Sequence, residues 1–168
     1  DSKYISIQNG EVVDFQMNKI CAAGTGSFVE EQAARMGIPL AEFGPLALSS
    51  EHPASLGERC TVFIETAIAS ASAEGISRAD IVAGLCHSIV QNYLHKVVGS
   101  KPVGQHIVLH GGVDYIPGIV AAFQSAYGDR IQVSPVFSIS GAYGAALLAH
   151  EAVGDAPSRF VGFDSPAK

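Results

Sequence analysis

The chain has 168 residues, of which 48% are hydrophobic and 15% charged, so it can bury the core of one domain or of one lobe of a two-lobed protein. Its formal net charge is −6 and it has no basic patch, which argues against nucleic acid or an anionic membrane as a partner. The apolar runs end before they reach membrane-spanning length and no signal-peptide pattern is present, so we expect a cytoplasmic protein.

The first elements predicted along the chain are two strands of a hairpin. Residues 3–8 and 11–16 favour β-structure and are joined by Asn9-Gly10, the strongest short signal for a hairpin turn. The sequence opens directly on this strand and closes on the Pro-bearing tail 156–168, so we expect a piece of a longer polypeptide.

A helix and an irregular stretch follow the hairpin. Ser27 and Glu30 form a capping box, which predicts a helix over 27–36 that ends at Gly37. Residues 40–59 contain two prolines and only short apolar clusters, so no regular element is predicted there.

Two helices are predicted in the middle of the chain. The first begins near Cys60 or Thr61 and reaches residues 74–75, and the second runs over 77–98 and stops at Gly99. Apolar residues form a wide face on the second helix, which predicts that it is largely buried. They fall in two stripes: Ile81, Leu85, Ile89 and Tyr93, and Val82, Cys86, Val90 and Leu94.

The last third of the chain alternates between strands and helices. Strands are predicted over 106–110 and 131–134, each followed by a helix, over 114–127 and 141–153. This β-α-β-α order is typical of a sheet with helices packed on it, and therefore of an α/β fold.

Two of the three cysteines stand where chemistry is possible. Cys21 precedes one predicted helix and Cys60 begins another, and the free N–H groups of a helix start stabilise a thiolate or an anionic centre. From position alone, the simpler interpretation is that Cys21 and Cys60 are two small buried residues and not ligands of a metal. If both are ligands of a cubane cluster, which needs about four thiolates, a symmetric homodimer must supply the other two. Cys86 lies in an apolar stripe and is predicted to be core.

Two glycine-rich turns are the other candidate binding sites in the sequence. Gly24-Thr25-Gly26 precedes a capped helix and could bind an anion through backbone N–H groups, but such turns are common. Gly111-Gly112-Val113 follows a predicted strand, and paired glycines let a backbone approach a ligand closely. A tight strand-to-helix turn explains the pair equally well. Glu65, one turn into the helix after Cys60, is interpreted as a surface residue that could also orient something near the cysteines.

Five segments, in the right order, resemble the BadF/BadG/BcrA/BcrD family of ATP-dependent activators of 2-hydroxyacyl-CoA dehydratases. The most specific is Cys21-Ala22-Ala23-Gly24-Thr25-Gly26, and the resemblance covers roughly residues 1–150. The matching segments are 17–30, with that string; 60–65, the second cysteine motif; 80–90, the long helix; 110–113, the adenosine motif; and 141–149, the closing helix.

The resemblance implies a ribonuclease-H-like lobe of the actin/Hsp70/sugar-kinase superfamily, with a mixed sheet that lacks its first strand, over residues 1–153. Residues 154–168 would be a tail or a linker to a following domain. It further implies one 4Fe–4S cluster held by Cys21 and Cys60 of both subunits of a homodimer, and ATP or ADP with Mg²⁺. The implied partner is a 2-hydroxyacyl-CoA dehydratase or a benzoyl-CoA-reductase-like enzyme that receives one electron. The implied nucleotide-binding residues are Gly24, Thr25, Gly26, Gly111, Gly112 and Val113.

The sequence departs from the family pattern at its start. Both phosphate-binding motifs of the family would precede Asp1, so we expect no catalytic residue in this chain and no ATP hydrolysis by it alone. Two alternatives stay open. One is an actin- or sugar-kinase-like ATPase whose cysteines are only packed, and the other is a docking or dimerisation lobe without a redox cluster.

Overall fold

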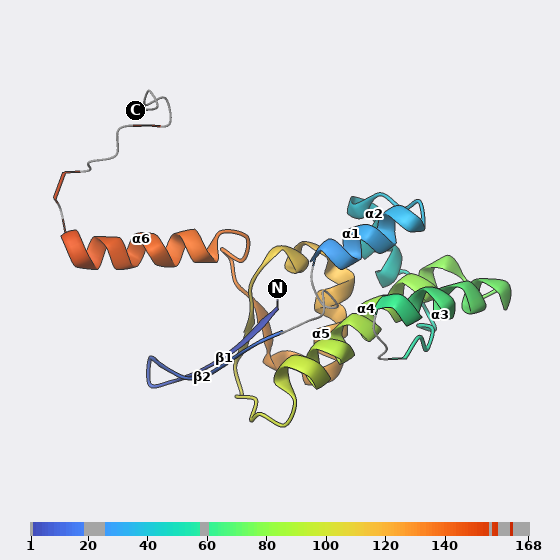
Figure 1. Cartoon of the computed structure of the whole chain (residues 1–168), viewed down its shortest axis with the longest axis horizontal. Coiled ribbons are helices and arrows are strands. Elements are labelled where there is room, and N and C mark those ends of the chain that lie inside the picture. The colour runs from blue at the N-terminus through green and yellow to red at the C-terminus, as the bar shows by residue number, and fades with distance from the viewer. Residues whose placement is uncertain (1, 19–25, 58–60, 155, 158–161, 163–168) are drawn as a thin grey trace.

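The computed structural model describes residues 2–18, 26–57, 61–154, 156, 157 and 162. It contains both strands and helices, as predicted for an α/β protein, and the two kinds of element alternate in the last third of the chain (Figure 1). In chain order the elements are β1 (Lys3–Gln8), β2 (Glu11–Met17), α1 (Gly26–Arg35), α2 (Leu40–Leu48), α3 (Thr61–Ala73), α4 (Arg78–Tyr93), the π-helix η1 (Leu94–Val98), β3 (Ile107–Leu109), the 3₁₀ turn η2 (Gly112–Tyr115), α5 (Pro117–Tyr127), the 3₁₀ turn η3 (Gly128–Arg130), β4 (Ile131–Val133) and α6 (Ser140–Val153).

The predicted hairpin is confirmed. β1 and β2 pair antiparallel, and Asn9 and Gly10 between them have φ angles of 53° and 84°. Positive φ at both turn residues is what a two-residue type I′ turn requires, and Asn-Gly is the pair that adopts it most easily. Two phenol groups hold β1 against the rest of the fold: Tyr93 donates to the Lys3 carbonyl at 2.9 Å, and Tyr4 donates to the Pro102 carbonyl at 2.6 Å.

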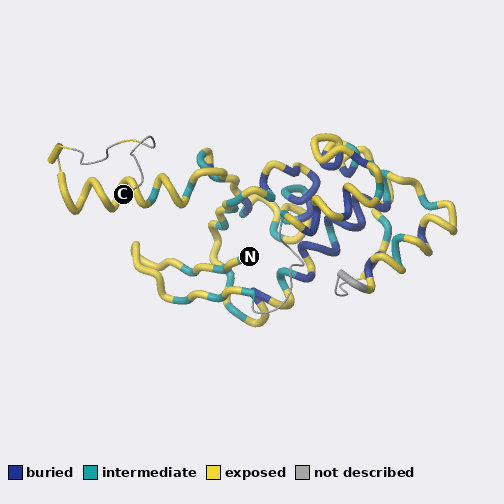
Figure 2. The backbone as a smooth tube through the Cα atoms, turned by 45° about the horizontal axis from the view of Figure 1, so that its top comes forward, coloured by how far each residue is buried: buried dark blue, intermediate teal, exposed yellow. Residues whose placement is uncertain are grey.

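α4 is the centre of the core. α2, α3 and α5 all pack against it, and Figure 2 shows the buried backbone concentrated in this part of the molecule. Both predicted apolar stripes are buried along α4, as far as Tyr93 and Leu94, which are half-buried. The largest fully buried side chains of the fold are Val29, Phe43, Ile64, Val82, Leu85, Cys86 and Ile119.

The prediction of irregular structure over 40–59 is wrong for its first half, where α2 forms. Pro45 lies inside this helix and removes one intrahelical hydrogen bond, which is why its presence argued against a helix. Tertiary packing outweighs that loss. Phe43 on the same helix is fully buried, and Gly44 lets α5 approach so closely that a Cβ there would overlap the Pro117 ring.

The long helix predicted over 77–98 is present: α4 begins one residue later, at Arg78, and η1 continues it to Val98. Ser77 caps it, since its hydroxyl oxygen accepts from the Asp80 backbone N–H at 3.1 Å, and Gly99 ends it with a φ of 59°. Its last turn widens into the π-helix η1, which no sequence signal indicated.

The alternating last third is also confirmed in order. β3 and β4 pair in parallel, joined by α5. The predicted helix over 114–127 begins later, because residues up to Tyr115 form the 3₁₀ turn η2 and Pro117 then takes the first helical position, where its missing N–H costs nothing. Within the described residues, the hairpin and the parallel pair are two separate two-stranded sheets, so the single mixed sheet that the resemblance implied is not formed there.

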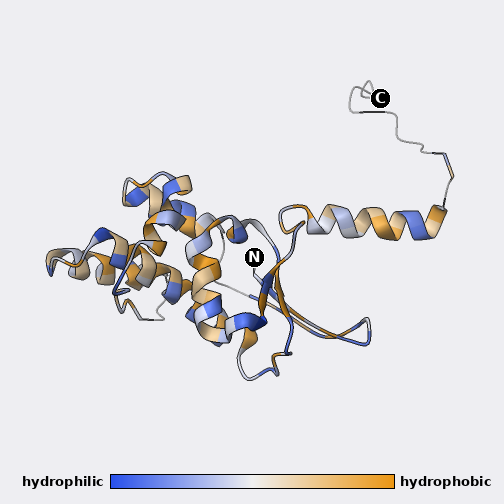
Figure 3. Ribbon diagram, turned by 180° about the vertical axis from the view of Figure 1, so that it is seen from behind, coloured by the Kyte–Doolittle hydropathy of each residue, from blue (hydrophilic) through white to orange (hydrophobic). Residues whose placement is uncertain are grey.

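α6 lies apart from the core. It spans the predicted range, contains no buried residue, and extends away from the other helices in Figures 1 and 3. Its exposed apolar side chains include Tyr143, Leu147 and Leu148. In the described part of the chain, no helix has both the length and the apolar character that crossing a bilayer requires.

Candidate functional site

The helices expected after the two candidate cysteines are present. α1 begins at Gly26, five residues after Cys21 in the sequence, and α3 begins at Thr61, the residue after Cys60. Cys21, Gly24, Thr25 and Cys60 themselves lie outside the described residues. The N-terminus of each helix, where the helix dipole carries partial positive charge, thus follows a cysteine in the sequence.

An ion pair connects these two helices. Arg35, the last residue of α1, lies 2.8 Å from the carboxylate of Glu65 in α3, and 2.8 Å from that of Glu31 one turn earlier in α1. Glu31 and then Glu65 raise the pKa of Arg35. All three side chains are exposed, so the pair contributes little to stability in water. It does show that the C-terminal end of α1 comes within reach of Glu65 in α3, which sequence reasoning did not predict.

Cys86 is a core residue, as predicted. Its side chain is 1% exposed, and burial raises the pKa of its thiol to about 12. The thiol is therefore protonated at neutral pH and is neither a nucleophile nor a ligand. Among the described residues, no three His, Cys, Asp or Glu side chains come together where they could hold a metal ion.

The second candidate region lies at the carboxyl ends of the parallel strands. Residues 110–113 leave β3 here and residues 134–137 leave β4, and the Gly111 N–H donates to the Phe137 carbonyl at 3.0 Å, which joins the two loops. Gly111 has a φ of 122°, which favours glycine, and no atom lies within 4 Å of the Cβ positions at Gly111 or Gly112. In open α/β sheets, ligands bind at this edge. The backbone of Gly111 and Gly112 is accessible there, and Val113, the third predicted nucleotide-binding residue of this loop, follows them.

Asp114 is a feature of this edge that sequence reasoning missed. Its side chain is 9% exposed, and Oδ2 is buried without a hydrogen-bond partner. Burial raises the pKa of this carboxyl to about 6, although His110 opposes the shift. The signal available in the sequence was an acid directly after Gly111-Gly112-Val113. Beside it, the rings of Tyr115 and Phe137 meet edge to face at 4.7 Å between centroids.

Replacing Asp114 with asparagine is expected to stabilise the protein at neutral pH. The folded-state pKa lies above the unfolded value of 3.8, so the wild type loses stability as pH rises through the window from 3.8 to about 6. Asp114→Asn removes that loss, and after allowance for solvent screening the gain is about 1 kcal/mol at pH 7.5. Urea unfolding of both proteins from pH 4 to pH 8 measures it. A difference that is constant with pH would contradict this assignment.

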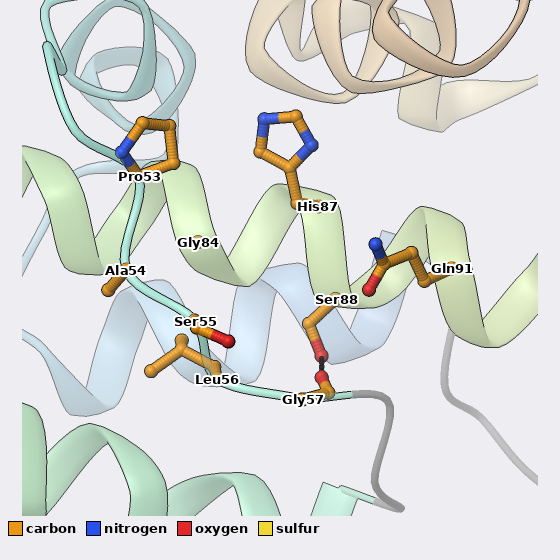
Figure 4. Close-up of a pocket in the computed structure, with 9 residues that line it drawn as sticks. All are labelled: Pro53, Ala54, Ser55, Leu56, Gly57, Gly84, His87, Ser88 and Gln91. Carbon is orange, nitrogen blue, oxygen red and sulfur yellow. Dashed lines mark hydrogen bonds between the residues drawn. The ribbon is translucent and has the colours of Figure 1, made fainter.

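A groove lies between α4 and the segment 53–57 (Figure 4). Its volume is about 620 Å³, and the polar side chains along it are Ser55, His87, Ser88 and Gln91. Ser88, which lines the groove, donates a short hydrogen bond to the Gly57 carbonyl. Among the described residues that line the groove, no two titratable side chains stand together for acid–base chemistry.

Comparison with known proteins gives a consistent result. The model of the BadF/BadG/BcrA/BcrD ATPase family matches residues 1–149. The chain is 34% identical over 154 residues to the (R)-2-hydroxyglutaryl-CoA dehydratase activating ATPase of Acidaminococcus fermentans, covering 90% of this chain and 58% of that protein. It is 34% identical over 152 residues to the 2-hydroxyisocaproyl-CoA dehydratase activator of Clostridioides difficile, covering 90% and 57%.

A solved structure is similar throughout most of the fold. It is that of the activator of the 2-hydroxyisocaproyl-CoA dehydratase from Clostridium difficile with bound ADPNP, at a TM-score of 0.81 and 33% identity, covering 89% of this chain and 56% of that one. The chain thus spans somewhat less than three fifths of the length of the relatives it matches. The expected α/β ATPase lobe is therefore confirmed.

Proposed function

The chain belongs to the BadF/BadG/BcrA/BcrD ATPase family, and from this premise we propose that it is part of an ATP-dependent one-electron donor to a 2-hydroxyacyl-CoA dehydratase or a benzoyl-CoA-reductase-like enzyme in the cytoplasm. The observation that carries the proposal is that a helix begins directly after Cys60 and another shortly after Cys21. In this proposal residues 1–153 form the ATPase lobe, and residues 154–168 are a tail or linker.

Cys21 and Cys60 are the residues proposed to hold a 4Fe–4S cluster. A bound cluster would supply a carrier for a single electron at low potential. The donor set fits because thiolates are the ligands that iron–sulfur clusters take, and each of the two cysteines is followed in the chain by a helix N-terminus with partial positive charge. Each chain supplies two thiolates, so four ligands require a homodimer with the cluster on its two-fold axis.

ATP or ADP with Mg²⁺ is proposed to bind at the carboxyl edge of β3 and β4. The support is the accessible backbone of Gly111 and Gly112, together with the ADPNP bound to the similar activator. Val113 and the loop residues Gly24, Thr25 and Gly26 complete the proposed contacts. Gly26 is the first residue of α1, and its neighbours in the loop lie outside the described residues.

The test is the iron and acid-labile sulfide content of protein prepared without oxygen, together with its mass in solution. About four irons and four sulfides per dimer are expected. A well-folded dimer without iron would overturn the electron-donor proposal and leave an actin-like ATPase lobe with packed cysteines. A dimer that persists without iron or nucleotide would favour the docking-lobe alternative.

A further inference from the structure

An exposed aromatic ring lies beside the accessible glycine pair at the carboxyl edge of the parallel strands. Tyr115 is the last residue of the 3₁₀ turn η2 and is 68% exposed, whereas its neighbours Asp114 and Ile116 are buried. The Asp114 N–H donates to the Gly111 carbonyl at 3.2 Å, and this bond closes the first part of the turn. The Ile116 N–H donates to the Val113 carbonyl at 3.0 Å and closes the second part. The Tyr115 ring therefore stands in solvent on a backbone that is held in place.

Phe137 braces this ring from the neighbouring loop. The two rings meet edge to face, with 4.7 Å between their centroids and 72° between their planes, and the Phe137 carbonyl accepts from the Gly111 N–H at 3.0 Å. In such a pair the edge of one ring meets the face of the other, so Phe137 covers at most one face of the Tyr115 ring. A free face on a braced and exposed ring is a surface on which a planar ligand can stack.

The ring projects from the same side of the turn as the open position at Gly112. Gly112 is the first residue of η2, three positions before Tyr115, and side-chain directions at positions i and i+3 of a 3₁₀ helix eclipse each other. No atom lies within 4 Å of the Cβ position at Gly112, so this side of the turn is open there. Three steps of about 2 Å separate the two residues along the turn. A nucleoside is long enough to contact the Gly112 backbone with its sugar and the Tyr115 ring with its base.

We propose that Tyr115 is the platform on which the base of the bound nucleotide stacks, and that Phe137 orients its ring. This inference rests on the proposed function, because it concerns the nucleotide proposed to bind at this edge. Stacking needs only the π-face of a base, and every base has one. Tyr115 therefore contributes affinity for a purine nucleotide without choosing between adenine and guanine.

The test compares nucleotide binding by the whole chain and by three variants. Tyr115→Ala removes the ring, and Tyr115→Phe keeps its face and removes only the hydroxyl. Tyr127→Ala is the matched control, because Tyr127 ends α5 ahead of β4 and so lies toward the opposite edge of the parallel strands. Equilibrium dialysis measures the dissociation constants of ATP, GTP and inorganic tripolyphosphate. Thermal unfolding without ligand compares the stabilities, and proton NMR follows the Tyr115 ring resonances during titration.

Tyr115→Ala is expected to weaken the binding of ATP and of GTP by about tenfold or more, and by the same factor. Its affinity for tripolyphosphate should equal that of the wild type, because tripolyphosphate has no base. Tyr115→Phe and Tyr127→Ala should keep the wild-type constants. In the wild type, the ring current of the base should move the Tyr115 ring resonances upfield with ATP, and tripolyphosphate should leave them in place.

Two results would overturn the stacking role while the proposed function stands. One is a Tyr115→Ala protein that binds ATP as the wild type does, or no better than an equally weakened Tyr127→Ala. The other is a Tyr115→Phe protein that loses as much affinity as Tyr115→Ala, since a contact of the hydroxyl would then explain the loss. A wild type that binds neither ATP nor GTP would overturn both the stacking role and the proposed nucleotide site, and the iron content of the same sample tests the cluster separately.

Discussion

Protein with Cys21→Ser and Cys60→Ser together is expected to contain no iron and no acid-labile sulfide after anaerobic preparation. A serine hydroxyl is not ionised at neutral pH and replaces a thiolate poorly as a cluster ligand. Each single variant removes two of the four proposed ligands of a dimer, so each should also lose most of its iron. Colorimetric iron and sulfide assays, with the absorption spectrum in the visible range, measure the loss.

Cys86→Ala is the matched control for this experiment. The Cys86 thiol is buried, and burial raises its pKa to about 12, so it offers no thiolate to iron. Iron content should therefore stay at the wild-type level even if the variant melts earlier, because only a small core atom is lost. Iron that survives in the double variant, or that disappears in Cys86→Ala, would contradict the assignment of ligands.

The same double variant also tests whether the cluster is what holds the two subunits of the dimer together. If the four proposed thiolates hold the subunits together, the double variant should sediment as a monomer or dissociate at lower concentration than the wild type. A double variant that lacks iron and remains a dimer would show that protein surfaces supply the association. Exposed apolar side chains on α6 and on the hairpin are among the surfaces that could supply it.

Local signals in the sequence predicted most of the fold. Asn9-Gly10 determines its turn through backbone preference alone, and Ser77 and Gly99 mark the two ends of the long helix by capping. These features depend on a few neighbouring residues, so no knowledge of the rest of the fold is needed. The fold class followed from the family resemblance and from the β-α-β-α order of the last third.

The features that sequence reasoning missed depend on contacts between distant residues. α2 survives the proline inside it because Gly44 admits the Pro117 ring, seventy-three positions away. Two other features also depend on contacts that exist only in the folded chain. They are the ion pair of Arg35 with Glu65 and the burial of the Asp114 carboxylate. The thiols of the candidate metal site were named from the sequence, and that assignment stays a prediction.

The existence and packing of α2 have a direct test in two apolar residues of that helix. Phe43 is 0% exposed and Leu48 is 55% exposed, although both lie in the stretch for which sequence predicted no regular element. Phe43→Ala is expected to lower the free energy of unfolding by about 3–5 kcal/mol, because it removes a buried ring and leaves a cavity between α2, α4 and α5. Leu48→Ala should change it by less than about 0.5 kcal/mol.

Urea unfolding followed by circular dichroism measures both values. Phe43→Leu adds a graded control, since it keeps most of the apolar volume and should lose less than Phe43→Ala. In an irregular surface stretch, both side chains would be similarly solvated and their removal would have similar, small effects. A small effect of Phe43→Ala would therefore contradict the packing of α2. It would also contradict the path of the segment 50–57, because that segment follows the end of α2 and then runs along α4.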